Sequence, residues 1–126
     1  MRYSSLADFI DKGTSAFAKG PVALVFVEDL IEVESTIRYH QLTGFRAIVV
    51  FGPTEMELPH TLEQEIHRID YPVLEVADVQ KAVNAAIDIA EGTWLYYCYN
   101  AEYLFFPFCE TRNVNELLVF HTEERR

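Results

Sequence analysis

Two short apolar runs, Val22-Ala-Leu-Val-Phe-Val27 and Ala47-Ile-Val-Val-Phe51, decide the fold class of this chain. Each run is continuous and rich in β-branched residues, which is typical of a strand buried on both faces of a sheet. A helical pattern over 31–42 separates them, and Gly44 follows it in the position of a C-terminal cap. Strand, helix and strand in this order predict a βαβ unit, with Val22–Val27 as the first strand of a parallel sheet.

The same alternation continues on both sides of this unit. Ser4 or Ser5 is placed to cap an N-terminal helix that reaches Phe17, with Gly13 weakening its middle. Further along, the pattern predicts helices over 61–69 and 79–90, strands over 73–76 and 94–99, and a last helix that starts near Asn113. We therefore expect an α/β fold, a three-layer sandwich with a mostly parallel central sheet of the Rossmann-like type.

Composition removes several classes of function. The 126 residues include 20 Asp and Glu against 10 Lys and Arg, giving a formal net charge of −10. This charge repels phosphate backbones, so no nucleic-acid partner is expected. No apolar stretch approaches the roughly 20 residues that span a bilayer, and Asp8 and Asp11 interrupt any export signal, so we expect no integral membrane contact and a cytoplasmic location. Cys98 and Cys109 form no CxxC pair and are expected to be reduced and mostly buried.

Motifs of the common catalytic and phosphate-binding types do not occur. The sequence has neither GxGxxG nor GxxxxGK[ST], and it has no HExxH or GxSxG. Its histidines show no metal-ligand spacing, so structural or surface roles are expected for His40, His60, His67 and His121.

Ligands of parallel α/β sheets bind beyond the carboxyl ends of the strands, where the strand order reverses. The corresponding loops are Glu28-Asp29, Gly52-Pro53, Ala77-Asp78 and Asn100-Ala101-Glu102. The carboxylates of the first loop suit ribose hydroxyls or base N–H groups, and the alternative is a solvated loop that caps the next helix. In the last loop, Asn100 and Glu102 offer oxygen ligands to Mg²⁺ or Mn²⁺, and the alternative is a turn on the rim of the sheet.

Two blocks of the chain resemble the family-2-like glycosyltransferases of the GT-A fold, in particular a bacterial group. The first block is Glu28–Phe51, which contains an acidic loop, a helix with Tyr39-His40 near its end, and Gly44. The second block is Gln80–Leu104, which is similar to the family's segment from a Lys and an Asn through Trp-Leu to the metal-binding DxD. The resemblance covers roughly residues 21–120 in the correct order, and it implies a GT-A-like half-domain that binds a nucleotide sugar.

The resemblance assigns roles to particular residues. Asp29 falls on the acidic position used near the uracil and ribose, Lys81 and Asn84 fall on the helix that faces the nucleotide, and Glu102 falls on the glutamate after the DxD. The nucleotide-sugar-binding set implied by motif and loop position is Glu28, Asp29, Lys81, Asn84, Asn100 and Glu102, with Glu102 as the candidate metal ligand and no catalytic residue.

This sequence departs from the family at the metal site. Tyr99 and Ala101 occupy the two Asp positions of the DxD, and Gly52 replaces the acidic residue after the second strand. An ion bridging a diphosphate would lose most of its protein ligands, and the stabilisation of the leaving group would weaken with it. The resemblance implies Mg²⁺ or Mn²⁺ as cofactor, whereas these substitutions count against metal-dependent sugar transfer.

The resemblance also sets the expected domain organisation. Residues 1–20 are expected to form an N-terminal helix that packs on the core, and residues 21–126 a GT-A-like domain that is one half of a larger fold. The acceptor-binding half and the catalytic base of the family follow the DxD segment. An aromatic run close to that segment suits the sheet core and the surface that the other half would cover, and the alternative is a platform that stacks a sugar or base. Part of the run is expected to be exposed and to promote a homo-oligomer; its members are Trp94, Tyr96, Tyr97, Tyr99, Tyr103, Phe105, Phe106 and Phe108.

Three functions follow as hypotheses. The leading one is a glycosyltransferase-related domain that binds a nucleotide diphosphate sugar and, in a complete protein, transfers the sugar to a hydroxyl acceptor. The alternative is a non-catalytic binding or scaffolding module that lost the metal site. A third is a receiver-like or flavodoxin-like domain, which the Gly52-Pro53 strand ending disfavours because receiver chemistry needs carboxylates and a Lys at strand ends.

Overall fold

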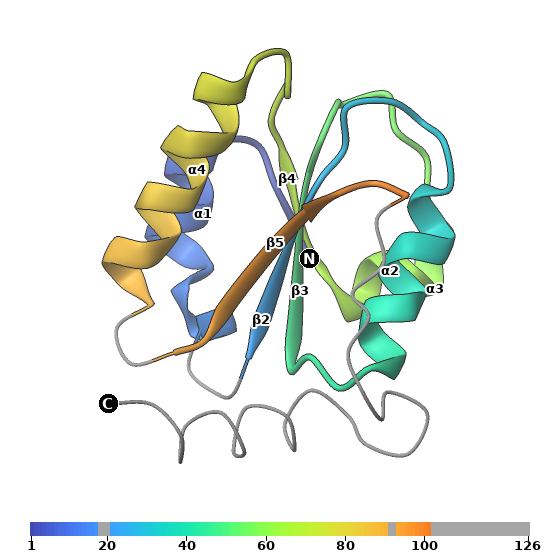
Figure 1. Cartoon of the computed structure of the whole chain (residues 1–126), viewed down its shortest axis with the longest axis horizontal. Helices are drawn as coiled ribbons and strands as arrows, with labels where there is room; N and C mark the ends of the chain where they lie inside the picture. Colours follow the sequence, from blue (N-terminus) through green and yellow to red (C-terminus); the bar gives the residue numbers. More distant parts are fainter. Residues whose placement is uncertain (18–20, 91–92, 102–126) are drawn as a thin grey trace.

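The computed structural model describes residues 1–17, 21–90 and 93–101 as an α/β sandwich (Figure 1). Its central sheet contains β1 (Arg2–Tyr3), β2 (Val22–Phe26), β3 (Ala47–Gly52), β4 (His67–Asp70) and β5 (Leu95–Tyr99). Every pairing between these strands is parallel, and their order is β1-β4-β3-β2-β5. The predicted fold class is therefore confirmed, with the two deciding apolar runs as adjacent central strands.

Side chains alternate between two cores because successive residues of a strand point to opposite faces. Val22, Leu24 and Phe26 of β2 enter a core with α1 (Leu6–Lys12), the 3₁₀ helix η1 (Thr14–Phe17) and α4 (Val76–Ile89). Ala23 and Val25 enter the opposite core with α2 (Val33–Leu42) and α3 (His60–Glu65). Figure 1 shows α1 and α4 on one side of the sheet and α2 and α3 on the other.

The order of the strands tests the receiver-like or flavodoxin-like hypothesis. Counted from β2, the strands lie in the order third, second, first, fourth, which is the first part of the Rossmann order 3-2-1-4-5-6. A flavodoxin-like sheet has its first strand between its second and third, whereas here β4 pairs with β3 and not with β2. The receiver-like or flavodoxin-like hypothesis is therefore wrong, because receivers share the flavodoxin-like strand order.

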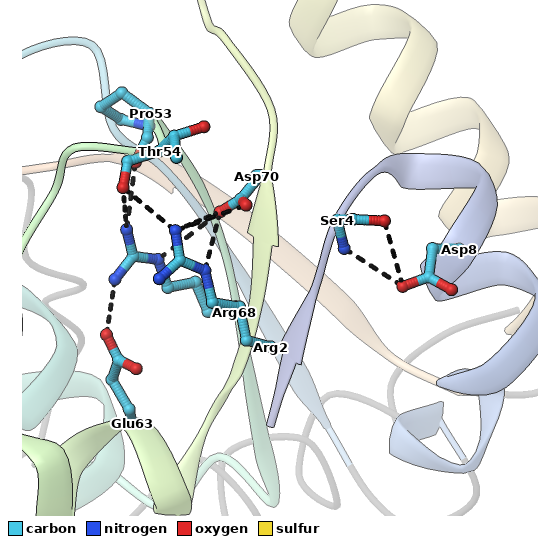
Figure 2. A network of polar contacts seen from close by, with 8 residues as sticks. All are labelled: Arg2, Ser4, Asp8, Pro53, Thr54, Glu63, Arg68 and Asp70. Atoms are coloured by element: carbon cyan, nitrogen blue, oxygen red, sulfur yellow. Dashed lines mark hydrogen bonds and ion pairs between the residues drawn. The ribbon is translucent and has the colours of Figure 1, made fainter.

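A strand precedes the expected first one. Arg2 and Tyr3 form β1, which pairs with Arg68 and Ile69 of β4 at one edge of the sheet. Ser5 then caps α1, accepting a hydrogen bond from the N–H of Asp8, while Asp8 accepts from the N–H of Ser4 (Figure 2). The sequence prediction missed β1 because a two-residue strand has too few positions to show a period.

The N-terminal helix is shorter than predicted. It ends at Lys12, where the N–H of Gly13 donates to the carbonyl of Phe9 at 2.7 Å. The ring of Phe9 lies against Gly13 so closely that a Cβ there would come within 2.4 Å of it. The residues after Gly13 continue as η1, so Ala16 and Phe17 reach the core from a separate turn.

Two predictions between 61 and 76 are wrong. The expected helix over 61–69 stops at Glu65, and the chain continues from His67 as β4. The expected strand over 73–76 is a connection that leads into α4, because Glu75 and Asp78 form a capping box at the start of that helix. Of the other predicted elements, the helices over 31–42 and 79–90 and the strand over 94–99 are found within a few residues, as α2, α4 and β5. The helix predicted from Asn113 lies outside the described residues.

Polar contacts around Arg68 join β1, β4 and the loop after β3 (Figure 2). The Arg68 side chain is only 1% exposed, and its guanidinium donates to Glu63 of α3 at 2.5 Å and to the carbonyls of Pro53 and Thr54 at 3.1 Å. Arg2 reaches the Thr54 carbonyl and the carboxylate of Asp70 from the other side. A charged residue therefore lies in the centre of β4, facing the core formed with α2 and α3.

Candidate functional site

The strand order reverses at β2, and this point defines the candidate site. From β2 the chain passes to β3 and β4 on one side, and it returns to place β5 on the other. Phe26 and Tyr99 are opposite each other at the carboxyl ends of β2 and β5. The loop after β2 and the residues after β5 therefore meet where open α/β sheets bind ligands.

Asn100 joins these two loops through its side-chain amide. Its Oδ1 accepts a hydrogen bond from the N–H of Glu28 at 3.0 Å, and its Nδ2 donates to Asp29 Oδ1 at 2.6 Å and to the carbonyl of Ile31 at 2.9 Å. These partners fix the orientation of the amide, because the opposite orientation would place an oxygen against two acceptors and an NH₂ against a donor. Asn100 is 7% exposed, and its amide is fully used by protein groups.

Thr36 adds a second connection from the first turns of α2. Its hydroxyl donates to the carbonyl of Glu32 at 2.6 Å and accepts from the N–H of Ala101 at 2.7 Å. This role of Thr36 was not predicted, since a threonine near the start of a helix carries no signal for a partner 65 residues away. The connection depends on β5 lying beside β2.

The backbone of both loops adopts an unusual conformation at one residue each. Glu32 has φ 54° and Ala101 has φ 66°, and they are the non-glycine residues with positive φ in the described part of the chain. Side chains disfavour this left-handed region, and such residues persist where the surroundings hold them, often at binding sites. Here the hydrogen bonds of Asn100 and Thr36 supply that restraint.

Three of the predicted site residues come together at the reversal point. Glu28 and Asp29 are exposed, and Asn100 lies beneath them. Asp29 Oδ1 accepts from the N–H of Ile31 and from Asn100, while no hydrogen bond from the described residues reaches Asp29 Oδ2. The site therefore presents one carboxylate oxygen, held in place through the other, to a ligand that carries hydroxyl or N–H donors.

Other predicted residues lie elsewhere. Lys81 and Asn84 are exposed on α4, which belongs to the opposite helical layer from α2. Ala77 and Asp78, expected in a loop, are in the first turn of α4, where the Asp78 carboxylate accepts from the N–H groups of Leu74 and Glu75. Glu102 is outside the described residues.

The described residues at the end of β5 do not fit a divalent cation, and Glu102, the candidate metal ligand, lies outside them. Tyr99 and Ala101 carry no carboxylate, and Asn100 turns its NH₂ group, not its oxygen, toward Asp29. Mg²⁺ and Mn²⁺ require oxygen ligands, and an amide NH₂ beside Asp29 directs positive partial charge to the place a cation would take. Groups of three or more His, Cys, Asp or Glu that could hold a metal ion are also absent among the described residues.

An acidic groove opens beside the site, between the loop after β2 and the loop after β3. It has a volume of about 430 Å³, and its lining includes the apolar Val33 and Met56 and four glutamates, Glu32, Glu34, Glu55 and Glu57. Carboxylates in this number repel a diphosphate group. A phosphate-bearing ligand of Asp29 would therefore extend away from the groove.

The histidines and the described cysteine have structural surroundings. His40 is fully buried in α2, with Nδ1 2.8 Å from the carbonyl of Thr36 and Nε2 3.9 Å from Sγ of Cys98. Cys98 is buried, as predicted, while Cys109 and His121 lie outside the described residues. His67 contacts the hydroxyl of Tyr3 at 3.1 Å, and His60 is exposed on α3 beside Gln64.

The predicted aromatic surface is present in part. Tyr97 of β5 is 53% exposed and Trp94 is 39% exposed, while Tyr96 and Tyr99 are partly buried. The remaining four members of the group, Tyr103, Phe105, Phe106 and Phe108, lie outside the described residues. Among the described residues, no helix has the length and apolar character needed to cross a membrane.

Comparison of the chain with profiles of known protein families, with curated protein sequences and with solved structures gives no match. The class that fold and site define is therefore a Rossmann-like α/β domain with its candidate ligand site at the β2/β5 reversal.

Proposed function

We propose that this chain is a glycosyltransferase-related domain that binds a nucleotide diphosphate sugar and, in a complete protein, takes part in transfer of the sugar to a hydroxyl acceptor. The observation that carries the proposal is the position of Asp29 at the reversal of strand order between β2 and β5. This is the crevice in which open α/β sheets bind nucleotides. The ordered pair of sequence blocks that resemble family-2-like glycosyltransferases gives independent support.

Within this proposal, Asp29 is the group that recognises the nucleoside. A carboxylate accepts hydrogen bonds from ribose hydroxyls or from a base N–H, and such charge-assisted bonds are stronger than neutral ones. Glu28 adds a second exposed carboxylate at the same edge, and Lys81 and Asn84 are retained as candidates for more distant parts of the ligand.

Titration calorimetry on the full chain tests the proposal. Nucleotide diphosphate sugars with different bases are titrated with and without Mn²⁺, and at least one is expected to bind with measurable heat. Asp29→Asn should weaken that binding by about tenfold, since a hydrogen bond to a charged group is lost. Asp88→Asn is the matched control, because Asp88 is exposed on α4 and the variant changes the net charge equally. No heat and no thermal shift with any donor would remove the proposal.

The alternative proposal is a non-catalytic binding or scaffolding module. The observation that favours it is the commitment of the Asn100 amide to protein groups at the position where the resembled family carries its metal-binding segment. In this case Asp29→Ala would leave partner binding unchanged, and substitutions at Tyr97 or Trp94 would alter self-association. Sedimentation of the Tyr97→Thr variant beside the unaltered chain separates the two proposals, since nucleotide binding alone does not require this surface.

A further inference from the structure

The loops after β2 and β5 are connected by a side-chain amide, and not by a pair of carboxylates that could share a metal ion. The connecting group is an amide donor: Asn100 Nδ2 lies 2.6 Å from Asp29 Oδ1 and 2.9 Å from the carbonyl of Ile31. Its oxygen is directed away from Asp29 and accepts from the N–H of Glu28. One side chain therefore neutralises part of the Asp29 charge and fixes the loop on both sides of it.

A divalent cation would compete with this arrangement. To ligate an ion next to Asp29, the Asn100 amide would have to rotate by about half a turn so that its oxygen faced the carboxylate. That rotation breaks all three hydrogen bonds that the amide makes to the loop after β2. It also leaves the buried NH₂ group of a residue only 7% exposed facing the N–H of Glu28.

We propose that the amide of Asn100 takes the place of a divalent cation as the link between the β2 and β5 loops, so that Asp29 is positioned and the site binds its ligand without a metal ion. This inference rests on the proposed function for the identity of the ligand, but the link itself is independent of any ligand. Asn100 is in this view a positioning residue, which acts on a ligand through Asp29.

Thermal unfolding of the full chain tests the link without a nucleotide. The melting temperature of the unaltered chain is expected to be the same in millimolar MnCl₂ and in EDTA. Asn100→Asp places a second carboxylate against Asp29 and should lower the melting temperature in EDTA by about 5 °C or more. Mn²⁺ should recover much of that loss, because the variant creates the pair of oxygen ligands that the natural site lacks.

Two further variants separate the link from general effects. Gln80→Glu adds the same charge on the exposed face of α4 and should neither lose stability to this extent nor respond to Mn²⁺. Asn100→Ser removes the amide without adding charge, so it serves if Asn100→Asp does not fold. It should lower the melting temperature and give no recovery with Mn²⁺.

Two results would overturn the inference. One is stabilisation of the unaltered chain by Mn²⁺ that disappears in Asp29→Asn, which would mean that an ion binds at Asp29. The other is an Asn100→Asp variant that melts like Gln80→Glu in EDTA, which would mean that the amide holds nothing in place.

A binding experiment with nucleotide diphosphate sugars tests whether the site needs a metal ion to bind its ligand. Where a nucleotide diphosphate sugar binds the full chain, its affinity should agree within about twofold between Mn²⁺ and EDTA, and a loss of about tenfold in EDTA would contradict the inference. Failure of every nucleotide to bind would remove the proposed function, whereas the thermal experiment would still decide the link between the loops.

Discussion

The imidazole of His40 lies in the core between α2 and the sheet, with none of its surface exposed. Its Nδ1 is 2.8 Å from the carbonyl of Thr36, which can only accept, so Nδ1 carries the proton. Nε2 therefore holds the lone pair and faces the thiol of Cys98 at 3.9 Å. The rings of Phe45 and Tyr96 lie within 6 Å of the imidazole between centroids, and no carboxylate of the described residues pairs with it, so a second proton on the ring would be a buried charge.

His40 should make the stability of the protein fall on acidification. Burial lowers the pKa of His40 below its ordinary 6.5, so the unfolded chain binds a proton that the folded chain resists. The contribution of His40 to the free energy of unfolding is therefore fully present above its ordinary pKa, and it is lost as the pH falls below about 6.5. The contribution of His40 to the free energy of unfolding should be smaller at about pH 5.5 than at about pH 7.5.

Urea denaturation of the unaltered chain and of His40→Leu at those two pH values measures this effect. The variant should show a smaller loss of stability on acidification, whatever its stability at neutral pH. Burial lowers the pKa of His67 as well, but that contribution is common to both proteins. His60→Leu is the control for an exposed histidine, and an equal pH dependence in all three proteins would contradict the assignment.

At the level of single residues, sequence predicted part of the candidate site. Glu28, Asp29 and Asn100 were placed together because the carboxyl ends of parallel strands meet at one edge, which follows from the order of elements alone. The role of Asn100 was not predictable in the same way. An asparagine can act as an oxygen ligand or as an amide donor, and the sequence does not distinguish these roles. For Asn100 the positions of the Glu28 N–H and of the Ile31 carbonyl decide that the NH₂ group faces Asp29.

Among the elements, β4 carries a buried arginine whose polar contacts hold the strand in place. Arg68 is 1% exposed, its Nη1 donates to Glu63, and its Nη2 donates to the carbonyls of Pro53 and Thr54. Arg68→Met removes these bonds and leaves the part-buried carboxylate of Glu63 without its guanidinium partner, so the free energy of unfolding should fall by about 2–4 kcal/mol. Chemical denaturation followed by circular dichroism measures the change.

Arg38→Met provides the comparison for this prediction. Arg38 makes an exposed ion pair with Glu34 one turn away on α2, at 3.0 Å, and such pairs contribute little. Its replacement should change stability by less than about 0.5 kcal/mol. Equal effects of the two substitutions would show that the buried network contributes no more than a surface pair.

The same network explains why β4 was not predicted. His67-Arg68-Ile69-Asp70 alternates charged or polar with apolar residues only weakly, and an arginine at a fully buried strand position does not fit the apolar pattern of parallel strands. The run over 73–76 has the more strand-like composition, yet the capping box of Glu75 and Asp78 commits it to the start of α4. In both places tertiary contacts and caps, rather than propensity, decide the element.

For the whole molecule, the position of each strand in the sheet should govern its stability against local opening. β2 and β3 are central, and Val22–Phe26 is completely buried, whereas β5 pairs only with β2 within the described part of the chain. Edge strands open at lower free energy than central ones. Amide hydrogen exchange should therefore be slowest in β2 and β3 and faster in β5 by about tenfold or more.

One amide should depart from this order, and it links the sheet to the candidate site. Ala101 is exposed and follows the edge strand, yet its N–H donates to the buried Thr36 hydroxyl at 2.7 Å. Because that bond must break before the amide exchanges, Ala101 should exchange more slowly than the half-exposed Tyr97 inside β5. Residue-resolved exchange by NMR makes the comparison, and Thr36→Val, which removes the acceptor, should abolish the difference. The N–H of Tyr97 points away from β2, because Trp94 and Asn100 are the residues whose backbone bonds to β2, so Tyr97 serves as an amide outside this ladder. Equal exchange of Ala101 and Tyr97 in the unaltered chain would mean that the hydrogen bond to Thr36 does not protect Ala101, and that the two loops are not held together there.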